Sequence, residues 1–174
     1  MLKNKDLFGL QQGLAQCKNL IGVKFAYAIA KNHAKIDSEI EALREAVKPT
    51  REFEVYDKER AELAKSFADK DDKGEPKINV IPQTGLSEYV IPPAKKKAFN
   101  KAFENLKRKN KKVVDAKNKQ IEEYNKLLEE ESKIELHKVN VELVPQDITV
   151  GQMELIMPII DDANLVKSIK KPKS

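Results

Sequence analysis

The stretch from Pro92 to Ser132, PPAKKKAFNKAFENLKRKNKKVVDAKNKQIEEYNKLLEEES, decides the fold of this 174-residue chain. Two prolines open it, and a helix tolerates proline there because the fixed φ and the missing N–H cost little in the first turn. No glycine or proline follows until Pro145. The stretch therefore predicts one helix of about 40 residues and roughly 60 Å. In so short a chain, such a helix should be a spine on which shorter elements pack.

Charge is distributed unevenly along this predicted helix. Its last third, from Glu122 to Glu131, is mainly acidic, whereas its first two thirds contain only Glu104 and Asp115 as acidic residues. The apolar stripe lapses over Lys107–Lys112, where the helix either leaves the bundle or is covered by lysine stems. The cations of the first two thirds are Lys95, Lys96, Lys97, Lys101, Lys107, Arg108, Lys109, Lys111, Lys112, Lys117 and Lys119.

The remaining sequence forms four regions around this spine. We expect a helical hairpin over 1–68, a loop with a small β-hairpin over 69–93, the long helix over 94–132, a strand and a short helix over 133–166, and a basic tail over 167–174. Together these regions predict an α+β fold that is predominantly α. Its architecture would be an antiparallel helical bundle around one long helix, in a single elongated domain.

The N-terminal helical hairpin is predicted from apolar periodicity. Apolar residues recur at spacings of three and four from Leu7 to Ile21 and again from Phe25 to Val47, which is one face of a helix. Gly22 should mark a break between the two runs. Pro49 ends the second run, and Thr50 should cap the next helix. Because so short a turn joins them, the helices on either side of it should pair antiparallel.

The C-terminal region combines a predicted strand and a predicted short helix. Residues Ile134–Val144 alternate apolar and polar side chains, with a slip at His137 and Lys138 that suggests a bulge. An open edge on this strand would invite a partner strand. Thr149 and Gln152 form a capping-box pattern at the start of the helix. The short helix carries more apolar side chains than one face can bury, so we expect a partner surface at Met153, Ile156, Met157 and Ile160.

Composition limits the classes of function. Charged residues make up 35% of the chain and aromatic residues only 6%, with no tryptophan. This composition is typical of a thin helical protein rather than of an enzyme with a deep pocket. The net charge is only +5, so any nucleic-acid site must rest on local charge. The single cysteine, Cys17, fits a reducing compartment, and no apolar run is long enough to span a membrane.

The sequence offers no residue set for catalysis or for a metal. His33 and His137 lie far apart and lack the spacing of metal ligands or of a nucleophile and base. The segment DKDDKGEP resembles the start of a calcium loop, but Lys73 and Val80 occupy positions that require oxygen ligands. We therefore expect neither an enzyme nor a bound cofactor.

The basic run is the one positive signal for nucleic acid. Lysine contacts to phosphate would release counterions and give salt-dependent affinity. The other interpretation is a solvated helix face, in which pairs such as Glu104 with Arg108 stabilise the helix at i,i+4 spacing. The residues that would contact nucleic acid are Lys107, Arg108, Lys109, Lys111 and Lys112.

Four segments resemble a family of small proteins from tailed phages and prophages of Gram-positive bacteria. They are GVKFAYAIAKN (22–32), IDSEIEALREAV (36–47), YDKERAELAKSFADKDDKGEP (56–76) and IELHKVNVELVPQDITVGQMELIMPIIDD (134–162). The likeness covers most of the chain as an order of features: helix pair, acidic glycine turn, long helix, strand and short terminal helix. It implies a phage setting and transfers no active-site residue.

We therefore expect a non-catalytic structural, assembly or protein-interaction component encoded by a phage, in the cytoplasm of the bacterial host or in the virion. Its partner would be a virion component, a host factor or a second copy of the chain. Two alternatives remain open. One is a nucleic-acid-binding accessory protein that uses the basic helix 95–119. The other is an inhibitor of a bacterial defence nuclease, whose acidic face would comprise Asp37, Glu41, Glu45, Glu52, Glu59, Asp71 and Asp72.

Overall fold

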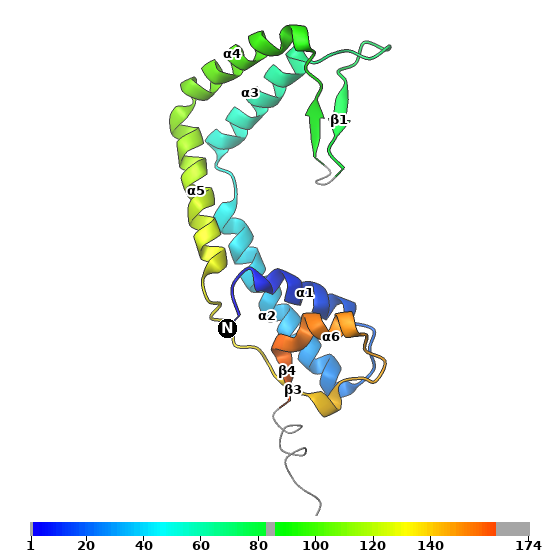
Figure 1. The fold of residues 1–174 in the computed structure, drawn as a ribbon. Coiled ribbons are helices and arrows are strands. Elements are labelled where there is room, and N and C mark those ends of the chain that lie inside the picture. The colour runs from blue at the N-terminus through cyan, green and yellow to red at the C-terminus, as the bar shows by residue number, and fades with distance from the viewer. Residues whose placement is uncertain (1, 83–85, 163–174) are drawn as a thin grey trace, which may run out of the picture. The chain divides into compact units, whose positions relative to one another are not determined.

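The computed structural model describes residues 2–82 and 86–162 (Figure 1). Over these residues the chain forms six α-helices, two 3₁₀ helices and four short strands, which confirms the prediction of a predominantly α fold with a few strands. The basic tail predicted at 167–174 lies outside the described residues. The chain divides into two compact units, a first unit of Met1–Val47 with Glu123–Ser174 and a second unit of Lys48–Glu122.

The first unit is built on three helices, α1 (Asp6–Gln16), α2 (Val23–Val47) and α6 (Val150–Ile156). Helix α1 packs against both α2 and α6. The predicted break between α1 and α2 is confirmed, because Gly22 has a φ of +146°, which disfavours residues with a side chain. Side chains at helical spacing form a continuous core, whose largest fully buried members are Phe25, Leu7, Leu10, Leu14, Ile36, Ile40, Ile156 and Ile159.

Helices α1 and α6 approach each other closely at Gly13. A Cβ atom placed on Gly13 would lie 2.5 Å from the Cβ of Leu155 and 3.2 Å from Cγ2 of Ile156. Such distances are shorter than van der Waals contact, so only glycine lets the two helices meet at this distance. The capping box predicted for α6 is confirmed, since Thr149 accepts from the backbone N–H of Gln152 and Gln152 accepts from that of Thr149.

The N-terminal segment closes the C-terminal end of α5 (Lys111–Glu129) within the first unit. The last carbonyls of a helix lack intrahelical donors and need other partners. The backbone N–H of Asn4 donates to the carbonyl of Glu130, and that of Lys5 donates to the carbonyl of Leu128, each at 3.0 Å. The buried Asn4 amide also donates to the carbonyl of Leu127 at 2.8 Å. These bonds link the two chain segments that make up the first unit.

The long strand predicted over Ile134–Val144 is wrong. Only β3 (Val139–Asn140) forms, paired parallel with β4 (Ile160–Asp161), and the 3₁₀ helix η1 (Val141–Leu143) follows it. Before β3 the chain takes its backbone partners from α2 instead of from a strand. The fully buried Asn32 side chain donates to the carbonyl of His137 at 2.8 Å and accepts from its N–H at 2.7 Å.

The second unit contains α3 (Arg51–Phe67), α4 (Pro93–Lys109), the first turns of α5 and the hairpin of β1 (Ile78–Val80) with β2 (Ser87–Tyr89). The predicted cap is confirmed, because the Thr50 hydroxyl accepts from the backbone N–H of Phe53. The hairpin is confirmed too, with β1 and β2 antiparallel. Helices α3 and α4 pack side by side (Figure 1), α3 at the C-terminal side of Thr50 and α4 after the hairpin.

The predicted single long helix is wrong, because it is interrupted at Asn110 between α4 and α5. Asn110 has φ −102° and ψ 22°, outside the helical region, and its side-chain amide donates to the carbonyl of Leu106 at 3.1 Å. Asparagine competes in this way with the backbone of a helix. The interruption falls within Lys107–Lys112, where the apolar stripe lapses, so no packing face holds the two helices in line.

Candidate protein-interaction surface

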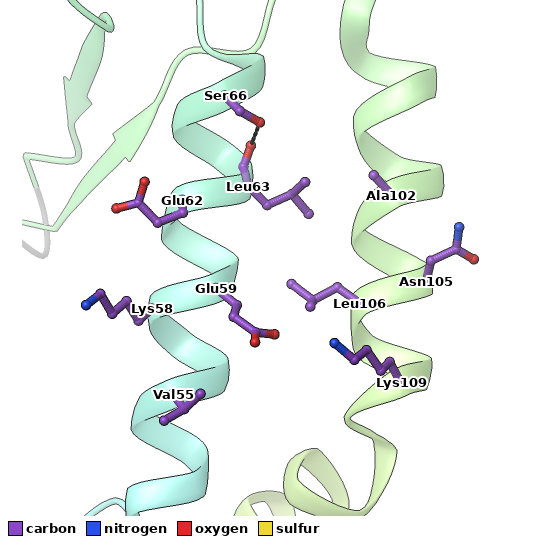
Figure 2. A pocket seen from close by; sticks show the side chains of 10 residues that line it. All are labelled: Val55, Lys58, Glu59, Glu62, Leu63, Ser66, Ala102, Asn105, Leu106 and Lys109. Atoms are coloured by element: carbon purple, nitrogen blue, oxygen red, sulfur yellow. Dashed lines mark hydrogen bonds between the residues drawn. The ribbon is translucent and has the colours of Figure 1, made fainter.

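An open groove of about 870 Å³ runs between α3 and α4 (Figure 2). The two helices are antiparallel, since Phe67 near the end of α3 lies against Phe99 near the start of α4, with ring centroids 5.7 Å apart. At the other end of the groove, Val55 of α3 and Lys109 of α4 line the same space. Figure 2 shows Leu63 of α3 and Leu106 of α4 pointing into the space between the helices.

The spacing of residues along each helix creates the groove. On α3, Val55, Glu59, Leu63 and their neighbours recur at intervals of three and four, so they share one face. On α4 the same rule aligns Ala102 with Leu106. The floor of the groove is therefore apolar. Its rim is polar and consists of Lys58, Glu59, Glu62, Ser66, Asn105 and Lys109.

The groove exposes apolar surface that the second unit does not cover. The side chain of Val55 is 54% exposed, and Leu63 and Leu106 are only partly buried. Among the described residues of this unit, the only buried apolar side chains are those of Tyr56, Ala68 and Val114. A helix pair with so few buried side chains gains little from the hydrophobic effect, which scales with the apolar area removed from water.

The groove also carries charged side chains. Among the described residues, none of Lys58, Glu59, Glu62 and Lys109 forms a salt bridge. In Figure 2 Glu59 points toward α4 and Lys109 points toward α3. The two walls differ in charge, because α4 has seven basic side chains and one acidic, whereas α3 has five acidic and four basic.

The β1–β2 hairpin offers a second exposed apolar surface in the same unit. Ile78 and Val80 lie on one face of β1, each 56% exposed, and pair with Tyr89 and Ser87 across the hairpin. A two-stranded hairpin has two open edges and is only marginally stable in water on its own. Its base is the acidic turn, where the Asp71 carboxylate accepts from the backbone N–H groups of Lys73 and Glu75.

The five residues predicted to contact nucleic acid lie on both sides of the interruption at Asn110. Lys107, Arg108 and Lys109 end α4, and Lys111 and Lys112 begin α5; all five are exposed. The structure therefore brings them together at one turn. Lys111 pairs with Asp115 at 2.5 Å, and Arg108 donates to the side-chain oxygen of Asn105 at 3.0 Å.

Phe99 and Phe103 are packing residues rather than free stacking platforms. Their rings stack on each other with centroids 5.9 Å apart, and Phe99 also contacts Phe67 edge to face. Both side chains are partly buried in the second unit. A base that stacked on Phe99 would therefore compete with the contacts that this ring makes with Phe67 and Phe103.

Of the four residues predicted as a partner surface at the C-terminal helix, Ile156 belongs to the core of the first unit and Ile160 packs against it. Ile156 is fully buried, so it is a core residue and offers nothing to a partner. Met153 and Ile160 are partly buried, and only Met157 is more than half exposed. The reason is that α6 packs on α1 at Gly13, and this contact buries apolar side chains of α6 for which the sequence alone showed no partner.

Both histidines have structural contacts in the first unit. His33 Nδ1 lies 2.6 Å from the Asp37 carboxylate, and the ring of His137 packs edge to face on Tyr27. A hydrogen bond from Gln11, with a smaller contribution from His33, lowers the pKa of Asp37. Burial raises the pKa of the Cys17 thiol, which makes it a poor nucleophile. No group of three or more potential metal ligands occurs among the described residues.

The strongest electrostatic feature of the first unit is structural as well. The ammonium groups of Lys5 and Lys3 bond to the Glu129 carboxylate at 2.7 and 2.9 Å, and these bonds lower its pKa to about 2. Glu129 lies at the end of α5, where the helix dipole disfavours a negative charge. The two lysines therefore compensate an unfavourable position while they hold the N-terminal segment.

The acidic residues considered for nucleic-acid mimicry are divided between the units. Asp37, Glu41 and Glu45 lie on α2 in the first unit, whereas Glu52 and Glu59 lie on α3 in the second. Asp71 and Asp72 lie in the turn before β1. Neither unit by itself presents the whole set.

Comparison of the chain with protein-family models, with curated proteins and with solved structures gives no match. Among the described residues, no helix combines the length and the hydropathy that a membrane crossing requires. The candidate site therefore rests on the geometry of this chain alone.

Sequence reasoning missed the α3–α4 groove. The available signal is the spacing of four residues that places Val55, Glu59 and Leu63 on one face of the helix. The groove residues are Val55, Lys58, Glu59, Glu62, Leu63, Ser66, Ala102, Asn105, Leu106 and Lys109.

Proposed function

We propose that this chain is a non-catalytic protein-interaction component, in the structure or assembly of a tailed phage or in its contact with a host protein. The observation that carries the proposal is the apolar surface of the second unit, exposed at the α3–α4 groove and at the hairpin. Clustered apolar exposure with a polar rim is typical of protein interfaces. The phage setting rests on the sequence resemblance.

The test compares partner capture by the wild-type chain with capture by a hairpin variant and a groove variant. The hairpin variant is Ile78→Thr with Val80→Thr, since threonine keeps the strand preference while it removes apolar surface. The groove variant is Leu106→Ser. The immobilised wild-type chain should retain from host lysate a protein that at least one variant fails to retain. Mass spectrometry of purified virions then shows whether that protein or the chain itself is a virion component. Equal, non-specific capture by all three baits would contradict the proposal.

Nucleic-acid binding is the second candidate, favoured by the five exposed cations around Asn110. We expect weak binding at low salt that vanishes at physiological ionic strength, because lysines on a solvated helix supply only the sequence-independent term. Reversing Lys107, Arg108, Lys109, Lys111 and Lys112 to glutamate should abolish whatever binding exists. Sub-micromolar affinity at about 150 mM salt, tighter than the usual non-specific range, would move this candidate to first place.

The nuclease-inhibitor alternative has less support. Its acidic residues lie on α2, on α3 and in the turn before β1, and the basic α4 shares the second unit with part of the set. Inhibition of a defence nuclease that survives neutralisation of Glu52, Glu59, Asp71 and Asp72 would assign such an activity to the first unit alone.

A further inference from the structure

The α3–α4 pair of the second unit is one layer of helices. A helix must bury its apolar stripe against another element, and stable helical domains do so with at least two layers. Here Val55, Leu63 and Leu106 form a stripe that remains open along the groove. No described element of the second unit covers it, so the groove lacks a second helical layer.

A second copy of the same layer has the right shape. Two antiparallel helix pairs stacked face to face form a four-helix bundle, in which each helix has antiparallel neighbours. A two-fold axis generates such a bundle from one surface, because the same patch then serves both partners. An axis parallel to α3 and α4 places α3 of one copy over α4 of the other. An axis perpendicular to them places α3 over α3 and α4 over α4.

Charge selects the first of these arrangements. The α4 helix has seven basic side chains and one acidic, so stacking α4 on α4 would oppose like charges. With α3 over α4, the α3 wall of one copy, where Glu59 and Glu62 outnumber Lys58, approaches Lys109 on the α4 wall of the other. These groove residues have no salt-bridge partner within the described part of their own chain.

We propose that the α3–α4 groove is a homodimer interface, in which α3 of each copy packs over α4 of the other. The inference rests on the proposed function, for which it names one surface and one partner. The dimer would bury Val55, Leu63 and Leu106 at its centre, and the acidic and basic rims would fix the pairing of the helices. The hairpin lies outside this interface and remains open to other proteins.

The first experiment measures mass by light scattering after gel filtration, with Val55→Asp against Val80→Asp as a matched control. Both valines are exposed to nearly the same degree, 54% and 56%, but only Val55 lines the groove. At about 100 µM, enough to populate mainly a dimer with a Kd of about 10 µM, the wild-type chain should show a mass well above 19.8 kDa that rises toward twice this value with concentration. Val55→Asp should raise the Kd at least about tenfold, and Val80→Asp should not change it. A monomeric wild-type chain, or equal effects of both variants, overturns the inference.

The second experiment exchanges the charges of the two rims. One variant carries Glu59→Lys with Glu62→Lys, and the other carries Lys109→Glu. Each alone should dimerise less than the wild type, because like charges then face each other across the α3–α4 contact. An equimolar mixture should recover a heterodimer, since every rim regains an opposite charge. Two weakened variants that do not combine would exclude this arrangement.

The experiments separate this inference from the proposed function. Suppose that the wild-type chain is monomeric and captures a host or virion protein that the Leu106→Ser variant does not capture. Another protein then occupies the groove. The homodimer would then be wrong and the interaction role would stand. A monomeric chain that also captures nothing specific would remove both.

Discussion

The two units differ in how far they bury their apolar residues. The first unit wraps α1, α6 and the segment before β3 around α2 and closes a core of fully buried leucine, isoleucine and phenylalanine side chains. The second unit has one layer of helices and a bare hairpin, and only Tyr56, Ala68 and Val114 are buried among its described residues. The comparison separates the part of the chain that holds the fold from the part whose apolar surface is open to partners.

The largest expected effect is the difference in stability between two aspartate variants, one in each unit. Ile156→Asp would bury an unpaired charge in the first unit and should cost about 3–5 kcal/mol or more, enough to unfold a marginal domain. Val80→Asp on the exposed hairpin should stay within about 0.5 kcal/mol of the wild type. Urea unfolding followed by circular dichroism measures both.

Met157→Asp is the internal control for that pair, because Met157 follows Ile156 directly but is 53% exposed. It should behave like Val80→Asp. If Ile156→Asp were tolerated as well as Met157→Asp, the closed core of the first unit would be wrong, and the partner surface predicted at the C-terminal helix would become plausible again.

Helix positions and caps could be predicted from the sequence because their causes are local. Thr50 and Thr149 cap the helices that follow them, and Gly22, with its positive φ, separates α1 from α2. The interruption at Asn110 depends on helix propensity and on packing together, and the spacing of apolar residues alone does not predict it. A poor helix former coincides there with a gap in the apolar stripe, and no neighbouring face compensates.

Other features could not be predicted because their partners are remote in sequence. The alternation from Ile134 predicts a strand, but the backbone N–H and carbonyl of His137 bond to the side chain of Asn32 on α2, 105 residues away. Strand alternation reports which side chains are buried and not what pairs with the backbone. The groove was hidden for a similar reason, since a stripe on α3 becomes a site only when α4 packs beside it.

A smaller effect should come from two glycines of α1, one of them in the tight contact of the first unit. Gly13→Ala would place a Cβ 2.5 Å from the Cβ of Leu155, and overpacking of this kind costs about 1–3 kcal/mol. Gly9→Ala has no atom within 4 Å of the new Cβ, and alanine favours the helix by up to about 1 kcal/mol. Thermal melts should therefore move in opposite directions. Stabilisation by both substitutions would show that α6 yields easily and that the first unit is less tightly packed than its geometry indicates.

The smallest expected effect concerns acid, and it compares one exposed carboxylate from each unit. In the first unit, Glu129→Gln removes a carboxylate whose pKa the Lys5 and Lys3 hydrogen bonds lower from 4.5 to about 2. In the second unit, Asp69→Asn removes one whose pKa is lowered from 3.8, chiefly by the Lys77 ammonium 3.1 Å away. A carboxylate with a lowered pKa stabilises the fold above its ordinary pKa and loses that contribution as pH falls through the folded value.

The melting-temperature difference between wild type and Glu129→Gln should therefore be constant above pH 4.5 and vanish by about pH 2. For Asp69→Asn the loss should begin below pH 3.8. Both differences should shrink in high salt, because exposed ion pairs are screened. Amide exchange assigns each effect to its unit: Glu129→Gln should alter protection in α1, where Lys3 and Lys5 lead into the helix, and Asp69→Asn should alter it at the base of the hairpin. If Glu129→Gln had the same melting temperature as the wild type at every pH, the backbone bonds of Asn4 and Lys5 would hold the N-terminal segment without help from the charges.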